Sequence, residues 1–143
     1  MADPLRALCT LAAALAVLLP TTAARGQAED SEPSLSLRVT PTSGFTPLRV
    51  RVVVDLVGGS DDYEEFYCPT IEWEWGDDTF SERSVDCDPY EAGKSEIQRR
   101  FAADHTYRQP GRHRIFFRMK QKSDVVAASR AYVDVRWGLG DRF

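Results

Sequence analysis

The sequence predicts an all-β domain that folds as a sandwich of seven strands. Apolar residues alternate with polar ones along several segments, which is the period of a strand with one buried face. Turn segments rich in glycine and proline separate these strands at intervals of roughly 8–12 residues, a spacing typical of β-sandwiches. After the first 26 residues, no apolar pattern has the period of a helix.

The N-terminal segment, residues 1–26, predicts a cleaved export signal. Its apolar run, residues 7–19, follows Arg6 and precedes Pro20 and several small residues. Such a run is too short to cross a bilayer and has the flanks of a secretory signal. We therefore expect a secreted or periplasmic protein with no transmembrane segment in the mature chain. A buried core helix is the less favoured alternative, because the run has no polar face.

The predicted domain spans residues 35–136, after a polar, acidic lead-in (27–34) that predicts disorder and before a C-terminal tail (137–143). Seven segments carry the strand pattern, and turn-forming residues separate them. In chain order the segments are 35–39, 48–56, 71–75, 80–85, 97–101, 112–119 and 131–135.

Alternating side chains justify most of these strands. The fourth is included as the return strand after the turn at Gly76, and the fifth is a shorter apolar segment. The inward positions of the other five are Leu35, Leu37 and Val39; Leu48, Val50, Val52, Val54 and Leu56; Ile71, Trp73 and Trp75; His113, Ile115, Phe117 and Met119; and Ala131, Val133 and Val135.

Two cysteines predict a disulfide that staples the central hairpin. Cys9 lies in the export signal, so the mature chain keeps Cys68 and Cys87, and an even count in an exported chain indicates a bridge. A hairpin register that pairs Trp75 with Phe80 also places the two cysteines opposite each other. The bridge would close a loop of about 20 residues and stabilise the fold by about 3 kcal/mol.

Four motifs, taken in order, resemble the polycystic kidney disease (PKD) domain family. They are Thr46-Pro47-Leu48, Trp73-Glu74-Trp75-Gly76-Asp77-Asp78, His105-Thr106-Tyr107 and Pro110-Gly111. The resemblance covers nearly the whole predicted domain. It implies an immunoglobulin-like sandwich that takes part in extracellular interactions, usually as one module of a larger protein. Glu74, Trp75, Asp78 and His113 depart from the family's usual residues, and the disulfide is not a general family feature.

The motif residues are expected to have structural roles. Trp73 and Trp75 alternate inward and should bury large aromatic surfaces. Gly76 allows a positive φ in the turn, and Asp77 can accept backbone N–H groups there. Tyr107 matches a position where sandwich domains anchor a buried tyrosine through its hydroxyl. His105 and Gly111 complete this structural set.

Charge is unevenly distributed along the chain, whose formal net charge is −4. This balance argues against nonspecific nucleic-acid binding. Residues 61–91 hold twelve acidic residues and one basic residue, whereas residues 94–143 hold twelve basic and five acidic ones. On the sheet surface, we expect Glu72 and Glu74 to face Arg114, Arg118 and Lys120 of the sixth strand, with each ion pair contributing a few tenths of a kcal/mol.

Two acidic loops with aromatic residues flank the cysteines and form the candidate binding surface. In a sandwich both loops lie at the end where immunoglobulin variable domains carry their binding loops, and the disulfide would hold them together. A merely solvated acidic surface is an equally weighted alternative. The candidate residues are Asp61, Asp62, Tyr63, Glu64, Glu65, Phe66, Tyr67, Asp88 and Tyr90.

No catalytic motif occurs in the sequence. It has two histidines, and it lacks the nucleophile, zinc-hydrolase and phosphate-loop patterns. We therefore expect a non-enzymatic module, without cofactor, that binds an extracellular or envelope protein or a polysaccharide. A calcium-stabilised structural domain is the runner-up, because acidic residues gather at both ends of the hairpin, although no spacing matches a known calcium loop. A small secreted hydrolase is the least favoured alternative.

Overall fold

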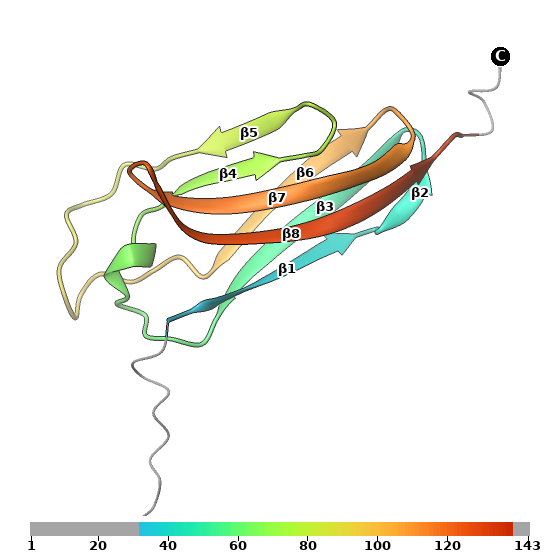
Figure 1. Ribbon diagram of the computed structural model, residues 1–143. Helices are drawn as coiled ribbons and strands as arrows, with labels where there is room; N and C mark the ends of the chain where they lie inside the picture. Colours follow the sequence, from blue (N-terminus) through green and yellow to red (C-terminus); the bar gives the residue numbers. More distant parts are fainter. Residues whose placement is uncertain (1–31, 139–143) are drawn as a thin grey trace, which may run out of the picture.

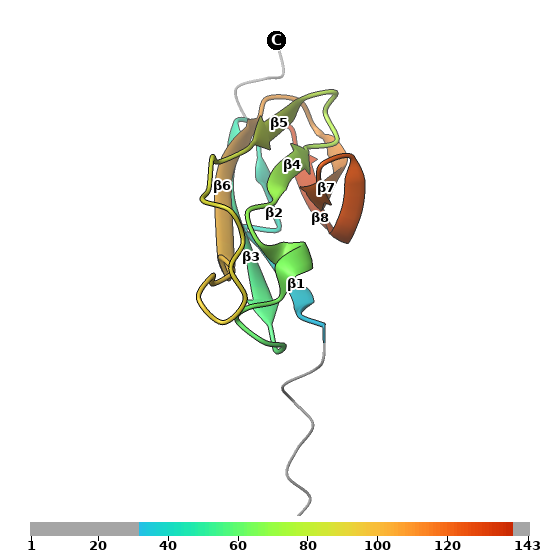
Figure 2. The same cartoon turned by 90° about the vertical axis from the view of Figure 1, so that its left-hand side faces the viewer.

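The computed structural model describes residues 32–138, which form two β-sheets packed face to face (Figure 1). The predicted export signal, most of the lead-in and the end of the tail lie outside this range. Figure 2 shows the two layers from the side: one sheet has the strand order β1-β3-β6, and the other β2-β8-β7-β4-β5. The strands are β1 Ser34–Thr40, β2 Ser43–Phe45, β3 Leu48–Val57, β4 Thr70–Glu74, β5 Phe80–Arg83, β6 Arg100–Tyr107, β7 Gly111–Gln121 and β8 Asp124–Arg136, with a short 3-10 helix η1 at Glu64–Phe66.

The core between the sheets consists of the apolar residues that alternate along the strands. All five predicted inward positions of β3, from Leu48 to Leu56, are buried, as are Ile115, Phe117 and Met119 of β7. The polar residues between them face solvent, because successive side chains of a strand point to opposite sides. The predicted all-β sandwich is therefore confirmed.

The strand count is eight within residues 32–138, one more than expected. The additional strand, β2, lies in a segment whose Pro, Gly and Ser residues predict a turn, and it pairs in parallel with the end of β8. Gly44 packs closely against the Leu48 side chain, because a Cβ at position 44 would lie 2.4 Å from Leu48 Cδ1. The chain thereby passes from the sheet of β1 to the sheet of β8.

The fifth predicted strand, 97–101, is displaced toward the C-terminus. The structure places a strand, β6, at Arg100–Tyr107, so the His-Thr-Tyr motif lies within it. Ile97 is buried as expected, but it is held by a single hydrogen bond from its N–H to the Asp61 carbonyl oxygen (2.8 Å). Residues 102–104 (Ala-Ala-Asp) have weak strand propensity, so pairing with β3 imposes the strand there.

The predicted register of the central hairpin is wrong by one residue. Glu74, rather than Trp75, pairs with Phe80, and the Trp75 N–H donates to the Thr79 carbonyl oxygen (3.0 Å). The loop has three residues because Asp78 as well as Gly76 takes a positive φ. A one-residue shift moves every side chain of the return strand to the other face, so Phe80 points outward and is 76% exposed.

The motif residues meet at one end of the sandwich, hereafter the turn end, where β4 turns into β5 and β6 turns into β7. Tyr107 is fully buried, and its hydroxyl donates to the Trp75 carbonyl oxygen (2.8 Å). The ring of His105 stacks on Trp75, and its Nε2 lies 2.7 Å from a carboxylate oxygen of Asp77. The buried ring of His113 stacks on Tyr107. These contacts make the motif residues one packing unit.

Asp77 and Gly76 fix the backbone of this turn. Asp77 accepts hydrogen bonds from the Thr79 N–H (3.3 Å) and hydroxyl (2.5 Å). Burial acts to raise the pKa of Asp77, but the bonds from Thr79 and His105 outweigh it, so the pKa lies below its ordinary value. Gly76 has φ +78, and a Cβ there would meet the backbone of Arg114 at 2.5 Å. Both features require the residue types that the motif supplies.

The outer face of β4 and β7 carries most of the expected ion pairs. Arg118 bridges Glu72 (2.6 Å) and Glu74 (2.9 Å), and Lys120 also pairs with Glu72. The hydrogen bond from Lys120 is the largest cause that holds the pKa of Glu72 below its ordinary value. Arg114 departs from the expectation: its guanidinium lies over the Phe116 ring, 4.5 Å from the centroid, and pairs with neither glutamate.

Candidate binding site at the loop end

The end of the sandwich opposite the turn end, hereafter the loop end, is formed by three connections (Figure 1). The β3–β4 connection (58–69) contains η1, the β5–β6 connection (84–99) has no regular strand, and the β7–β8 turn lies at residues 122 and 123. The two acidic loops predicted from the sequence belong to the first two connections. They lie far apart along the chain and side by side in space.

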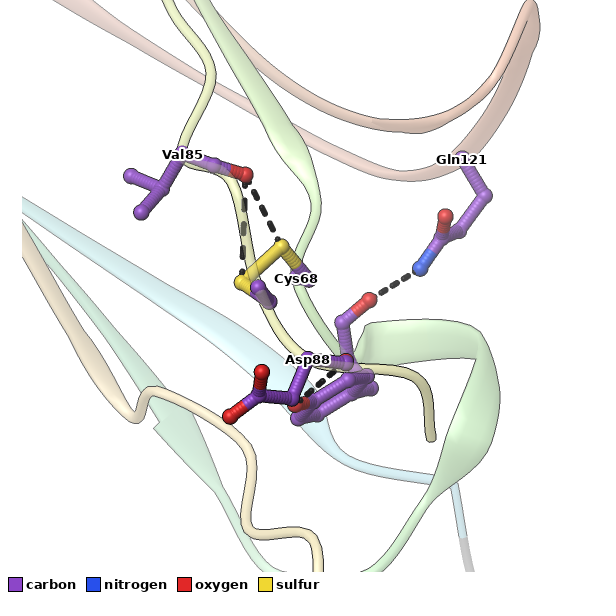
Figure 3. The surroundings of a disulfide bond; sticks show 6 residues. Cys68, Val85, Asp88 and Gln121 are labelled. Atoms are coloured by element: carbon purple, nitrogen blue, oxygen red, sulfur yellow. Dashed lines mark hydrogen bonds between the residues drawn. A yellow bond between two sulfur atoms is a disulfide. The ribbon is translucent and has the colours of Figure 1, made fainter. Parts of the chain in front are cut away.

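A disulfide joins the two acidic loops. Cys68 and Cys87 are bonded, with their Cα atoms 6.2 Å apart, which confirms the predicted bridge. The carbonyl oxygen of Val85 lies 3.0 Å from the sulfur of Cys68 and 3.8 Å from that of Cys87 (Figure 3). The bridge thus also holds the segment just after β5, residues 84–87, against the start of β4.

Two tyrosines add hydrogen bonds across the same gap. The Tyr67 hydroxyl donates to the Asp88 carbonyl oxygen (3.0 Å), and the Tyr90 hydroxyl donates to the Asp62 carbonyl oxygen (2.5 Å). The rings of Tyr67 and Tyr90 meet edge to face, with centroids 5.6 Å apart. Each loop therefore contributes one tyrosine that holds the other loop in place.

The β7–β8 hairpin is the third member of the site, and the sequence interpretation missed it. The side-chain amide of Gln121 donates to the Tyr67 carbonyl oxygen, and Figure 3 shows Gln121 reaching toward the loop from its strand. Lys122 takes a positive φ in the turn that follows, before Asp124 begins β8. The sequence does not indicate that these residues belong to the site, because a two-residue hairpin turn uses the same residue types wherever it lies.

A shallow hollow of about 620 Å³ lies where the three connections meet. Five of the nine candidate residues line it, together with the disulfide and the hairpin residues Gln121, Lys122 and Asp124. Carboxylates and tyrosines dominate the lining, with the cation Lys122 among them. The five candidates are Glu64, Glu65, Tyr67, Asp88 and Tyr90.

The electrostatic environment of the hollow is acidic. Partial burial, and then the nearby carboxylates of Asp62 and Glu64, raise the pKa of Tyr90 above its ordinary value. A phenol in such a field stays protonated at neutral pH and remains a hydrogen-bond donor. Because both tyrosine hydroxyls already donate their one hydrogen to the opposite loop, the hollow offers carboxylate acceptors and two aromatic edges to a ligand.

The other four candidates lie outside this hollow. Asp61 and Asp62 line a separate, smaller hollow of about 260 Å³, and Asp61 pairs with Arg99 (2.5 Å). Tyr63 packs partly against the core and meets the Phe66 ring edge to face. Phe66 is fully buried, so it belongs to the core and cannot contact a ligand. Phe66 follows two acidic residues of η1, so the sequence does not indicate that its side chain points into the core.

The part of the chain that the structure covers contains no assembled metal site. Across residues 32–138, no three or more His, Cys, Asp or Glu side chains are grouped so as to hold a metal ion. Over the same range, no helix is long and apolar enough to cross a membrane. The calcium hypothesis stays a prediction for a binding measurement.

A comparison with solved structures finds the PKD domain of an M14-like peptidase from Thermoplasmatales archaeon SCGC AB-540-F20. The match has a TM-score of 0.49 and 13% sequence identity, and it covers 73% of this chain and 96% of that domain. No family model and no curated protein matches the chain. A likeness at this level carries nothing about ligand or activity.

Proposed function

We propose that this chain is an exported, non-enzymatic binding module that recognises a protein or carbohydrate partner through its loop end. The observation that carries the proposal is the cross-linking of the two acidic loops by one disulfide and two tyrosine hydroxyls around a shared hollow. Loops held in this way lose little conformational entropy when a ligand binds, which favours affinity.

The chemistry of the hollow favours a partner with positively charged groups. Glu64, Glu65, Asp88 and Asp124 provide carboxylates, and charge-assisted hydrogen bonds to them are stronger than neutral ones. The tyrosines supply rigid, amphipathic contact area of the kind that is enriched at recognition sites. A basic protein segment therefore fits better than a neutral glycan, and the glycan is an outcome that the experiment distinguishes.

The test compares binding of arrayed basic peptides, acidic peptides and neutral glycans to the wild-type chain and two charge variants. Glu64→Gln with Glu65→Gln removes two exposed carboxylates at the loop end. Asp78→Asn with Glu82→Gln removes two exposed carboxylates that do not line the hollow, one in the β4–β5 turn and one on β5, and serves as the matched control. We expect salt-sensitive capture by basic peptides, weakened about tenfold or more in the loop-end variant, since each tenfold change corresponds to about 1.4 kcal/mol.

Two outcomes would reject the proposal. One is equal weakening in the control variant, which would mean that net charge rather than the loop end drives capture. The other is the absence of binding to every arrayed ligand. Thermal melts with calcium and with chelator belong in the same experiment, because a shift of several degrees would favour the calcium-stabilised alternative.

A further inference from the structure

A second surface of the molecule has the opposite charge. The outer face of β7 and β8 carries a row of arginines and aromatic rings, hereafter the arginine strip. The neighbouring strands place Arg114 opposite Tyr132 and Phe116 opposite Arg130. Its members are Arg112, Arg114 and Phe116 of β7 and Arg130, Tyr132 and Arg136 of β8.

The arginines of the strip are largely without carboxylate partners. Arg112 lies 4.0 Å from Asp134, whereas Arg114, Arg130 and Arg136 form no ion pair with any residue in the range 32–138. This contrasts with Arg118 on the same face, which Glu72 and Glu74 neutralise. Three exposed cations therefore remain available to an external anion on a chain whose formal net charge is −4.

Aromatic rings lie beneath two guanidinium groups of the strip, those of Arg112 and Arg114. The guanidinium carbon of Arg112 lies 4.7 Å from the centroid of the Tyr132 ring, and that of Arg114 lies 4.5 Å from the centroid of Phe116. Each ring face attracts the cation above it, and the guanidinium N–H groups can still donate to an external anion. Arginine, unlike lysine, can bind a planar carboxylate through two parallel hydrogen bonds.

The strip is extended rather than hollow. Alternate residues of a strand lie about 6.8 Å apart, so Arg130 and Arg136 are separated by roughly 20 Å along β8. Such a row suits a polymer that carries anionic groups at intervals.

The backbone of these strands excludes one way in which a peptide could bind. A peptide that binds as an added strand needs free N–H and C=O groups at a sheet edge. β7 lies between β4 and β8, and β8 lies between β2 and β7, so both are interior strands. The strip therefore offers side-chain donors without the backbone groups that a peptide strand would use.

The charge of the rest of the molecule argues against nucleic acid. Duplex DNA carries one charge per about 1.7 Å, and its binding depends on neutralising many phosphates. Three available arginines on an acidic protein can neutralise few phosphates. A polysaccharide with one carboxylate per sugar has a lower charge density than a nucleic acid duplex, so its binding requires fewer cations.

We propose that the arginine strip on the outer face of β7 and β8 binds an acidic polysaccharide that bears uronate carboxylates. This surface lies on the outer face of the five-stranded sheet and does not involve the residues of the loop-end hollow. The interaction uses arginine–carboxylate pairs, so it weakens as ionic strength rises.

The test measures affinity for purified polygalacturonate and alginate oligomers, with neutral dextran, polyglutamate and single-stranded oligothymidine as comparison ligands. The strip variant is Arg114→Gln with Arg130→Gln. The matched control is Arg49→Gln with Arg51→Gln, which removes two arginines, 75% and 60% exposed, from the outer face of β3. Thermal melts establish that both variants keep the fold.

We expect the wild-type chain to bind a uronate oligomer more tightly than any comparison ligand. The strip variant should lose about tenfold or more in affinity, whereas the control should stay within about twofold. The loop-end variant Glu64→Gln with Glu65→Gln should bind the uronate oligomer at least as well as the wild type, which separates this proposal from the previous one. The proposal is overturned if no uronate oligomer binds above the dextran background, if polyglutamate or oligothymidine binds as tightly, or if the control loses as much affinity.

Discussion

Replacing Tyr107 with phenylalanine tests whether the motif at the turn end stabilises the fold through a hydrogen bond or through packing alone. The substitution removes one oxygen and keeps the ring, which is fully buried and stacks on His113 with centroids 4.3 Å apart. The hydroxyl donates to the Trp75 carbonyl oxygen at 2.8 Å, so that acceptor loses its donor from β6. A buried polar group left without its partner costs about 1–3 kcal/mol, and we expect the free energy of unfolding to fall by that amount.

Urea unfolding followed by tryptophan fluorescence measures this loss, because Trp73 and Trp75 are both buried in the core. The transition midpoint should fall while the slope m stays constant, since the surface exposed on unfolding is unchanged. A loss of 1 kcal/mol lowers the melting temperature of a domain of this size by about 4–8 °C. Tyr132→Phe is the control, because Tyr132 is 41% exposed on β8. If both variants unfold at the wild-type urea concentration, the hydroxyl contributes nothing and the reasoning fails.

Three further predictions concern the disulfide, the turn and the buried histidine. Replacing Cys68 and Cys87 together by serine should lower the free energy of unfolding by about 3 kcal/mol, because the bridge spans 19 residues of chain; an unchanged urea midpoint would contradict this. Because folding lowers the pKa of Asp77, its carboxylate stabilises the fold above the ordinary pKa of 3.8, and this stabilisation is lost as the pH falls through the pKa of the folded state. The Asp77→Asn variant should therefore lose less stability in acid than the wild type. Parallel profiles of stability against pH for the variant and the wild type would refute this role of Asp77. Both ring nitrogens of His113 lie 3.1 Å from carbonyl oxygens, of Gly76 and Gln109, so His113→Phe should cost about 1–3 kcal/mol in urea melts, and a variant as stable as the wild type would show that neither contact matters.

The parts of the fold that the sequence predicted well are those determined by a local pattern. In β3, five apolar residues alternate with polar or less buried ones, and every one of the five is buried. Period two is a property of the strand itself, so it needs no knowledge of the neighbouring strands. Gly76 was predictable for a similar reason, because a positive φ favours glycine. The role of Tyr107 was instead expected from its match to a position where sandwich domains anchor a buried tyrosine.

The parts that the sequence did not predict depend on pairing between distant segments. β6 is a strand because β3 provides its partner, although Ala102 and Ala103 give little local indication of one. The hairpin register depended on Asp78, a non-glycine residue with φ 64, which lengthens the loop to three residues. The residue types in the turn do not show that Asp78, rather than Asp77, takes a positive φ. The longer loop shifts the register by one residue, so Phe80 points outward instead of into the core.

The candidate site was predictable to the extent that the cysteines indicated it. A bridge between Cys68 and Cys87 brings their flanking loops together, and five of the nine candidate residues share the resulting hollow. Phe66 was misplaced because an aromatic residue among acidic neighbours resembles an exposed contact residue. The contribution of Gln121 required the relative position of the β7–β8 hairpin, which only the assembled sandwich provides.

The two ends of the sandwich are stabilised in different ways, and this difference bears on where recognition can vary. At the turn end, the rings of Trp75, His105, Tyr107 and His113 pack on one another, so a substitution in one of them disturbs the core. At the loop end, the disulfide and two tyrosine hydroxyls hold the backbone, whereas the carboxylates of the hollow project from it. Exposed side chains outside the core change stability little when they are replaced. Side chains on the two proposed binding surfaces, the loop end and the arginine strip, can therefore change while the packing at the turn end keeps the fold constant.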